Sequence, residues 1–289
     1  MSARGGRARL APYLIGLPGG LWLLIFFALP LLVMFSLSLQ SGNVESGFRF
    51  TWEWSNYSRA WDLYSTQFIR SVVYALVVTG LCLVLAYPMA YWIAFYGGAR
   101  KSTYLFLILL PFFVSFVIRT ASWKFILNDQ GIVLGPLKDA GLLPQDFHIL
   151  ATTTAVLGGL TYNYLPFMVL PLYVALERVD PSLVEAAHDL FAGRASAFRK
   201  VVFPLSLPGV FAGVLITFVP VASDFVNTSI LGGTSTTMIG NVIQTVYLSN
   251  NNYPLASAMS FLLMAALLIG IFVYARALGT EQVMEVAQG

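Results

Sequence analysis

One acidic residue of this sequence lies within an apolar block, where a charge needs a special reason to be present. Asp224 is the only carboxylate inside any of the long apolar blocks, in the block from Gly209 to Leu231. A charge within a membrane costs roughly 2.5–3.5 kcal/mol on insertion scales, so such acids usually face a cavity or a partner. Asp224 is therefore a candidate for the wall of a solute path. The alternative is a charge pair with Arg119, Lys124 or a residue of another subunit.

The other reactive residue types form no catalytic or metal-binding pattern. His148 and His188 belong to no H-E-x-x-H motif, and Cys82 is the only cysteine, which excludes a disulfide framework and a thiolate metal site. The segment 97–102 contains glycines and a lysine but lacks the spacing of a phosphate-binding loop. We therefore expect no enzyme activity and no cofactor bound by this chain. Any ATP-driven work would need a partner that hydrolyses ATP.

The composition points to a membrane protein. Of the 289 residues, 58% are hydrophobic and 10% are charged, and the mean hydropathy is +0.77. Soluble domains are roughly 45–50% apolar and about 25% charged. The net charge of +3 is small and dispersed, so nucleic acid is not an expected partner. Lipid is the expected surrounding.

Six apolar blocks meet or approach the ~20 residues that a bilayer-spanning helix needs. The third is short, and we expect it to continue through Trp123 to Leu127, with Arg119 and Lys124 shielded from lipid. The first is too long for a signal peptide and is expected to be a retained span. The fold prediction is an all-α integral membrane bundle with spans at Leu17–Leu39, Ser71–Phe95, Thr103–Ile118, Ile149–Leu176, Gly209–Leu231 and Leu255–Ala275.

The distribution of positive charges predicts the orientation. One side of the predicted topology carries ten Lys and Arg residues and the other carries six, and the richer side belongs in the cytoplasm. Both termini are then cytoplasmic, as tails at residues 1–16 and 278–289. Of the outer loops, 40–67 is expected to form an aromatic belt at the membrane interface. The loop 128–144 is expected to form a short amphipathic helix on the surface or against a partner.

The loop between the fourth and fifth spans carries the clearest local pattern. Asp180 can cap a helix whose first residue is Pro181, and an apolar stripe follows at Leu183, Ala187 and Leu190. Gly193 is expected to end this helix in a left-handed turn, and Ser196 to start a second helix before Pro204. The pattern fits an ordinary interfacial hairpin, or a docking element for a cytoplasmic protein that pushes on the bundle.

This loop resembles the EAA loop of importer-type ABC transporter permeases. The resemblance rests on Glu185-Ala186-Ala187, on Pro204, and on Leu207-Pro208-Gly209. In that family the loop forms a coupling helix that sits in a cleft of the ATPase. One departure is that the family usually has glycine six residues after the glutamate, where this chain has Phe191. The resemblance implies a coupling loop at residues 177–206, with coupling residues Asp180, Glu185, Ala186, Ala187, Gly193, Arg194, Pro204 and Pro208.

Three further stretches, Leu110–Trp123, Leu165–Tyr173 and Leu231–Asn241, resemble the spermidine/putrescine importer permeases, and more narrowly the first of the two permeases of that system. The resemblance implies a six-helix type I permease that forms one domain over residues 1–289. It also implies a heterodimer with a second permease, two copies of an ABC ATPase that uses ATP and Mg, and an extracytoplasmic polyamine-binding protein.

A polyamine path should offer carboxylates and aromatic faces to ammonium groups. Besides Asp224, the candidates are aromatic or amide residues, although packing between helices or against lipid is an alternative for each. The rival functions are an ABC permease for another small solute and a secondary transporter driven by ions. The candidate path residues are Asp224, Phe225, Tyr162, Asn163, Tyr164, Phe112 and Trp123.

Overall fold

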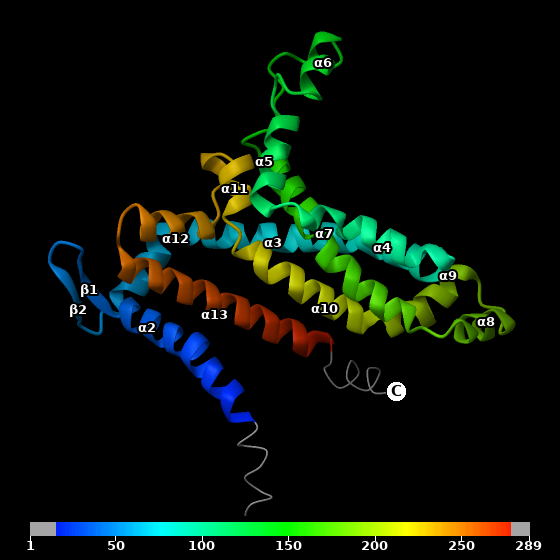
Figure 1. Ribbon diagram of the computed structural model, residues 1–289, viewed down its shortest axis with the longest axis horizontal. Coiled ribbons are helices and arrows are strands. Elements are labelled where there is room, and N and C mark those ends of the chain that lie inside the picture. Colours follow the sequence, from blue (N-terminus) through cyan, green and yellow to red (C-terminus); the bar gives the residue numbers. More distant parts are fainter. Residues whose placement is uncertain (1–15, 279–289) are drawn as a thin grey trace, which may run out of the picture. The chain divides into compact units, whose positions relative to one another are not determined.

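The computed structural model describes residues 16–278, so most of both predicted tails lies outside the described residues. The described chain is mainly helical (Figure 1). The first span is helical over Gly16–Ser38 and includes a π-helical turn, Leu24–Ala28. The principal elements are α2 (Leu29–Ser38), β1 (Gln40–Asn43), β2 (Gly47–Phe50), α3 (Ser55–Tyr96), α4 (Lys101–Leu109), α5 (Phe116–Ile126), α6 (Leu134–Asp139), α7 (Thr153–Glu177), α8 (Pro181–Asp189), α9 (Arg194–Ala197), α10 (Phe203–Ala222), α11 (Val226–Leu231), α12 (Ile239–Leu248) and α13 (Tyr253–Leu278).

The number of spans agrees with the hydropathy of the sequence. Within residues 16–278, five helices are long and apolar enough to cross a membrane, and the number is six if one bent pair is counted as a single span. That pair consists of the segments Gly98–Phe113 and Phe116–Ile126, which include α4 and α5. The α6 helix lies within the loop where a short amphipathic helix was predicted.

The third span is not the continuous helix that we expected. After a tight 3₁₀ turn at Leu110–Phe113, Val114 is extended, and α5 starts in a new direction at 89° to the preceding segment. Arg119 is buried, as predicted, but the Lys124 side chain is exposed, so its predicted shielding is not provided by the described part of this chain.

The fifth span also breaks, and its predicted continuity through Asp224 is wrong. The α10 helix ends at Ala222, and α11 is a separate short helix. Between them, the Asp224 carboxylate accepts a hydrogen bond from the backbone N–H of Asn227 at 2.8 Å. A side chain that binds a backbone N–H in this way competes with the helical pattern and starts a new helix.

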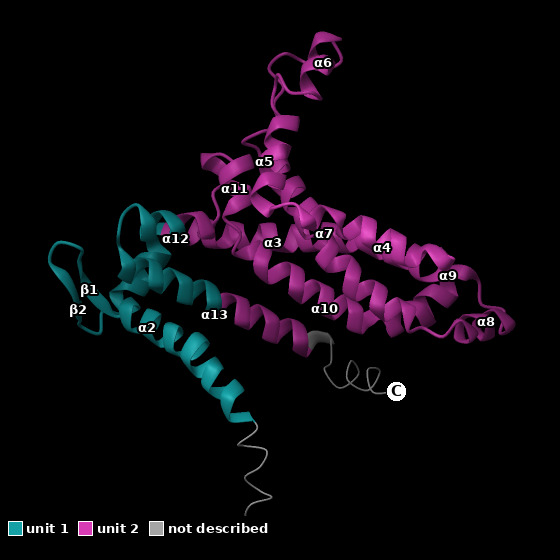
Figure 2. Cartoon of the chain, viewed as in Figure 1, with its two compact units in different colours: residues 1–63, 243–264 teal, residues 64–242, 265–289 magenta. Residues whose placement is uncertain are grey.

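The described chain divides into two compact units (Figure 2), and the prediction of a single permease domain stays a prediction. The smaller unit comprises residues 16–63 and 243–264. Within the loop that was predicted to form an aromatic belt, it contains an antiparallel hairpin in which Gln40 pairs with Phe50. The Asn56 amide of α3 donates hydrogen bonds to the carbonyl oxygens of Ser38 and Gln40, at 3.0 and 2.9 Å. These bonds join the first span, the hairpin and α3.

The larger unit, residues 64–242 and 265–278, is built around α7, which is largely buried. The helices α7 and α10 lie side by side (Figure 1) and approach closely where α10 has glycine. A methyl group added at Gly209 would lie 2.5 Å from Cβ of Ala175 and 2.6 Å from the carbonyl oxygen of Pro171. The α7–α10 contact therefore depends on the absence of a side chain at this position.

The substitution Gly209→Ala is expected to lower the melting temperature of the purified protein in detergent, because overpacking a closely packed contact costs about 1–3 kcal/mol. Gly158→Ala is the matched control, since Gly158 lies in α7 with nothing within 4 Å of an added methyl group. This control should leave the melting temperature unchanged or raise it, because alanine favours a helix over glycine by about 1 kcal/mol. Equal melting temperatures for the two variants would contradict the close packing.

Candidate functional site

The predicted coupling loop lies at one end of α7, with α8 and α9 beyond it (Figure 1). The α8 helix begins at Pro181, and Asp180 is its N-cap. The Asp180 carboxylate accepts a hydrogen bond from the backbone N–H of Ser182 at 2.9 Å, which holds the pKa of this carboxyl group below its ordinary value. The predicted cap is therefore confirmed.

The end of α8 differs from the prediction. Gly193 has a φ of −67° and is not the left-handed residue; it is the N-cap of α9. The left-handed residue is Phe191, with a φ of +60°. This is the position, six residues after Glu185, where the EAA pattern usually has glycine. The chain thus keeps the turn that this glycine would favour while carrying a bulky side chain there.

The second helix of the loop begins at Arg194 rather than Ser196, and it does not end before Pro204. Helical structure continues from α9 through a π-helical turn, Phe198–Val202, into α10. Proline lacks a backbone N–H and its ring crowds the preceding turn. A wider π turn ends two residues before Pro204, and the helix continues without a break from Arg194 to Ala222.

The outward face of the coupling loop is apolar and uncovered in the described chain. Leu190 is 82% exposed and Phe191 is 99% exposed, and Leu183 is also exposed. Glu185 and Ala186 share this exposure. Exposed large apolar side chains that stand together are typical of a surface for another protein.

An aromatic cluster joins the coupling loop to α3. The ring of Phe198 lies 5.6 Å from that of Tyr87 and 5.9 Å from that of Tyr91, both in edge-to-face geometry. The hydroxyl groups of Tyr87 and Ser206 are 2.7 Å apart, which adds a hydrogen bond between α3 and α10. Phe198 of the loop is therefore packed directly against α3, and α3 is hydrogen-bonded to α10.

A buried polar cluster lies near the other end of α10, around Asp224. Its Oδ2 atom accepts hydrogen bonds from the Tyr164 hydroxyl at 3.2 Å and from the Asn227 amide at 3.1 Å. The Asn163 amide donates to Asn227 Oδ1 at 2.8 Å and to Thr120 Oγ1 at 3.0 Å. Asp224 is only 6% exposed. The structure thus brings three of the predicted path residues together, and it adds Thr120 and Asn227, which the sequence did not suggest.

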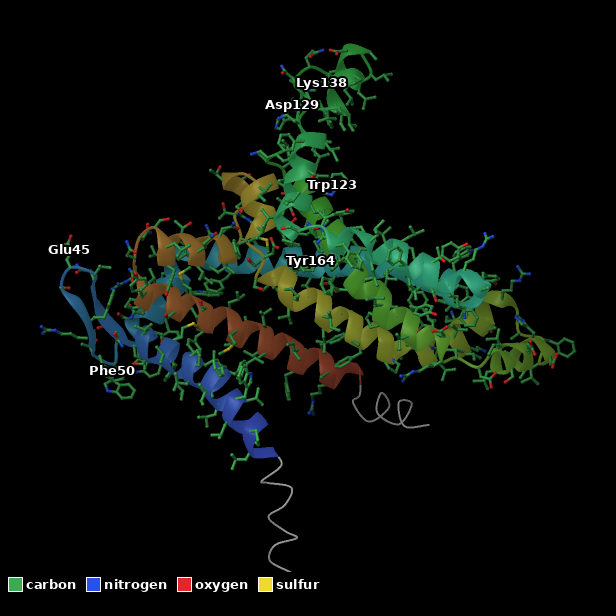
Figure 3. The ribbon with its side chains drawn as sticks, in the orientation of Figure 1. Glu45, Phe50, Trp123, Asp129, Lys138 and Tyr164 are labelled. Atoms are coloured by element: carbon green, nitrogen blue, oxygen red, sulfur yellow. The ribbon has the colours of Figure 1, made fainter. Side chains whose placement is uncertain are left out.

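Three other candidate path residues lie around Arg119 instead. The guanidinium carbon of Arg119 is 4.8 Å from the centre of the Phe112 ring. The rings of Trp123 and Tyr162 are 5.2 Å apart. Both residues line a cavity of about 410 Å³ together with Arg119; Trp123 is labelled in Figure 3. In the part of the chain that the structure describes, no ion pair joins Arg119 to Asp224. Phe112, Trp123 and Tyr162 thus stay candidate path residues, with the cation of Arg119 beside them.

Residues 20–278 match the family of binding-protein-dependent transport system inner membrane components. The chain belongs to this family. It is therefore a multi-pass permease subunit of the cytoplasmic membrane and not an enzyme, since a separate ATPase hydrolyses ATP in these importers. The coupling loop and the polar cluster are thus parts of a permease.

Among curated relatives of this permease, the spermidine/putrescine transport system permease protein PotB of Haemophilus influenzae is 35% identical over 257 residues, covering 89% of this chain and 90% of the relative. The PotB protein of Escherichia coli K12 is 34% identical over the same length, with 89% and 94% covered. These relatives confirm the resemblance to polyamine permeases.

Solved structures confirm the fold of the permease. A chain in the crystal structure of a bacterial ABC transporter involved in the import of the acidic polysaccharide alginate matches with a TM-score of 0.69 and 18% identity, covering 94% of this permease and 96% of that chain. A second structure, of the alginate transporter in complex with a pentasaccharide-bound periplasmic protein, matches with a TM-score of 0.66 and 20% identity. At this identity the likeness concerns the fold alone.

Phe191→Gly is expected to slow backbone amide exchange at residues 185–192. Glycine removes a left-handed penalty of about 1–2 kcal/mol, and its extra freedom in the unfolded chain costs about 0.5–1 kcal/mol. Leu190→Gly is the control, because Leu190 has a φ of −85° and no such penalty to remove. Exchange should therefore become faster in the control. Faster exchange in both variants would show that Phe191 is not strained.

Proposed function

We propose that this chain is one of two permease subunits of an ATP-driven polyamine importer and forms half of its translocation path. The observation that supports this most directly is the 34–35% identity to PotB permeases of the spermidine/putrescine transport system across about nine-tenths of both sequences. The exposed apolar coupling loop supports the same function, because it provides a surface through which an ATPase can act.

The proposed orientation places the coupling loop and both termini in the cytoplasm. The α7 helix of 25 residues is about 37 Å long at 1.5 Å per residue, enough to cross the hydrocarbon layer. The coupling loop follows its C-terminal end. Asn163 and Tyr164 lie about 20 Å from that end by the same rise. The polar cluster is thus placed in the outer half of the membrane, where a solute released by an extracytoplasmic binding protein would first arrive.

The proposed partners follow from what the chain lacks and what it exposes. Two ATPase subunits would bind ATP and Mg and would contact the coupling loops of this chain and of a second permease. Closure of the ATPases would push α8 and α9. The rings around Phe198 would pass this movement to α3, and the continuous helix from Arg194 to Ala222 would carry it to the outer cluster.

Asp224 is proposed to favour a polycation at the outer half of the path. The carboxylate is held in place by Tyr164 and Asn227, so its charge is fixed beside the break between α10 and α11. With a negative interior, each inward positive charge gains ~2.3 kcal/mol per 100 mV, or roughly 7 kcal/mol for a trication. ATP would then serve mainly to open and reset the path and to allow accumulation.

Asp224→Asn in the reconstituted transporter is expected to lower spermidine uptake at least about tenfold, because a hydrogen bond between an ammonium group and a charged carboxylate is worth about 1.5–3 kcal/mol. Basal ATP hydrolysis should stay within about twofold, since the substitution lies far from the coupling loop. Tyr164→Phe is the control: it removes one hydrogen bond to the carboxylate but keeps the charge, so uptake should fall much less. Undiminished uptake by Asp224→Asn would exclude this carboxylate from the path.

Leu190→Asp is expected to reduce the amount of ATPase that co-purifies with the tagged chain by at least about tenfold, because a charge at an apolar interface loses its hydration. Leu248→Asp, at an exposed leucine that the proposed orientation puts outside the cell, should leave the ATPase bound. If the unmodified chain brings down no ATPase, and uptake survives ATP depletion, the chain is an ion-driven transporter and the proposed function is wrong.

A further inference from the structure

Residues 115–148, here called the lateral arm, leave the bundle sideways. The arm contains α5 and α6, and its α5 helix stands at 89° to the segment that carries α4. Figures 1 and 3 show the α6 end of the arm, with Asp129 and Lys138, projecting away from α4, α7 and α10, whereas α5 packs against α11 and α7. The segment Gly98–Phe113 is about 24 Å long at helical rise, less than the ~30 Å hydrocarbon layer. The arm therefore starts within the outer part of the membrane.

Arg119 at the base of the arm is a buried cation with no ion-pair partner among the described residues. Its side chain is 7% exposed, and its Nε atom is buried without a hydrogen-bond partner in residues 16–278. The guanidinium lies over the rings of Phe112 and Phe116 and faces the 410 Å³ cavity lined by Trp123. A guanidinium keeps its charge in proteins, so a membrane site of this kind needs a negative partner.

The chain's own nearby acids are already engaged. The Asp224 carboxylate accepts hydrogen bonds from Tyr164 and Asn227. At the tip of the arm, Asp129 forms an ion pair with Lys138 at 3.4 Å, and Lys138 also donates to the carbonyl oxygen of Gln145 at 3.1 Å. The charges of Asp129 and Lys138 at the tip of the arm are thus paired, whereas the charge of Arg119 at its base has no ion-pair partner within residues 16–278.

The surface of the arm also carries large apolar side chains that no described residue covers. Phe125, Ile132 and Leu142 are strongly exposed along it. By the length of the preceding segment, the base of the arm lies about 6 Å below the edge of the hydrocarbon layer, so Arg119 is inside the hydrocarbon and not at the level of the headgroups. A neighbouring membrane helix can cover apolar side chains and bring a carboxylate at this depth.

We propose that the lateral arm is the contact surface for the second permease subunit, and that a carboxylate of that subunit enters the cavity and binds Arg119. A carboxylate can accept two parallel hydrogen bonds from a guanidinium group, which would fix the register of the two subunits. This inference rests on the proposed function for the existence of a second permease. It adds the surface, and the residue, through which the two permeases meet.

The first test is Arg119→Gln in the whole transporter, extracted in mild detergent through a tag on this chain. The amount of second permease that co-purifies should fall at least about tenfold, because the carboxylate of the second permease would then be buried without a cation. Lys124→Gln is the matched control, since it removes an exposed cation from the same helix, and recovery should stay within twofold. Arg119→Lys should keep part of the contact. Undiminished recovery of the second permease with Arg119→Gln would overturn the proposal.

The second test is photo-crosslinking, which detects the contact in the assembled transporter and does not require a variant that dissociates it. A benzoylphenylalanine in place of Phe125 or Ile132 is expected to form an adduct with the second permease. Adducts only with lipid or only with the binding protein would overturn the proposal. The same probe in place of Phe191 should capture the ATPase. A transporter that gives the Phe191 adduct but no arm adduct keeps the proposed function and loses this inference.

Discussion

The hydrogen bonds accepted by the carboxylate of Asp224 are the interaction on which the end of this permease away from the coupling loop depends. In hydrocarbon, backbone groups that leave a helix must find partners within the protein. Two spans break here, at Val114–Ser115 and at Ser223–Phe225. The helices that follow the breaks, α5 and α11, pack together and share the cluster of Thr120, Asn163 and Asn227. One polar cluster thus binds the backbone N–H of Asn227 after the second break and joins the helices that follow both breaks.

The two ends of the permease are connected by helices that have little freedom to slide. The α7–α10 contact is close enough at Gly209 to exclude a methyl group, and α10 is continuous with α9 at the coupling loop. At the other end, α10 stops at the residue before the break that Asp224 caps. In the proposed mechanism, a push at the loop would reach the cluster along the continuous helix from Arg194 to Ala222 and its closely packed neighbour α7. This arrangement suits a path whose gate lies far from the site of ATP hydrolysis.

Properties set by neighbours along the chain could be predicted from the sequence. Long apolar blocks located the spans because a bilayer requires a fixed helix length, and Asp180 before Pro181 located the start of α8 because capping is a local contact. The breaks could not be predicted in this way. Their partners, Thr120, Asn163 and Asn227, are far apart in sequence and meet only after folding. The position of the left-handed turn was predicted wrongly for a different reason. The surrounding loop holds Phe191 in that conformation against the preference of its residue type.

The π turn at Phe198–Val202 sets how far the coupling loop is rotated about the helix axis relative to the fifth span. Each residue of an α-helix advances the chain by about 100° around the axis. A π turn holds one residue more than an α turn, so the side chains before it face a different direction from the one that unbroken α-helix would give them. Shortening this turn by one residue would turn α8 and the loop around the axis of α10 by roughly a quarter of a revolution and would move Phe198 away from the rings of α3.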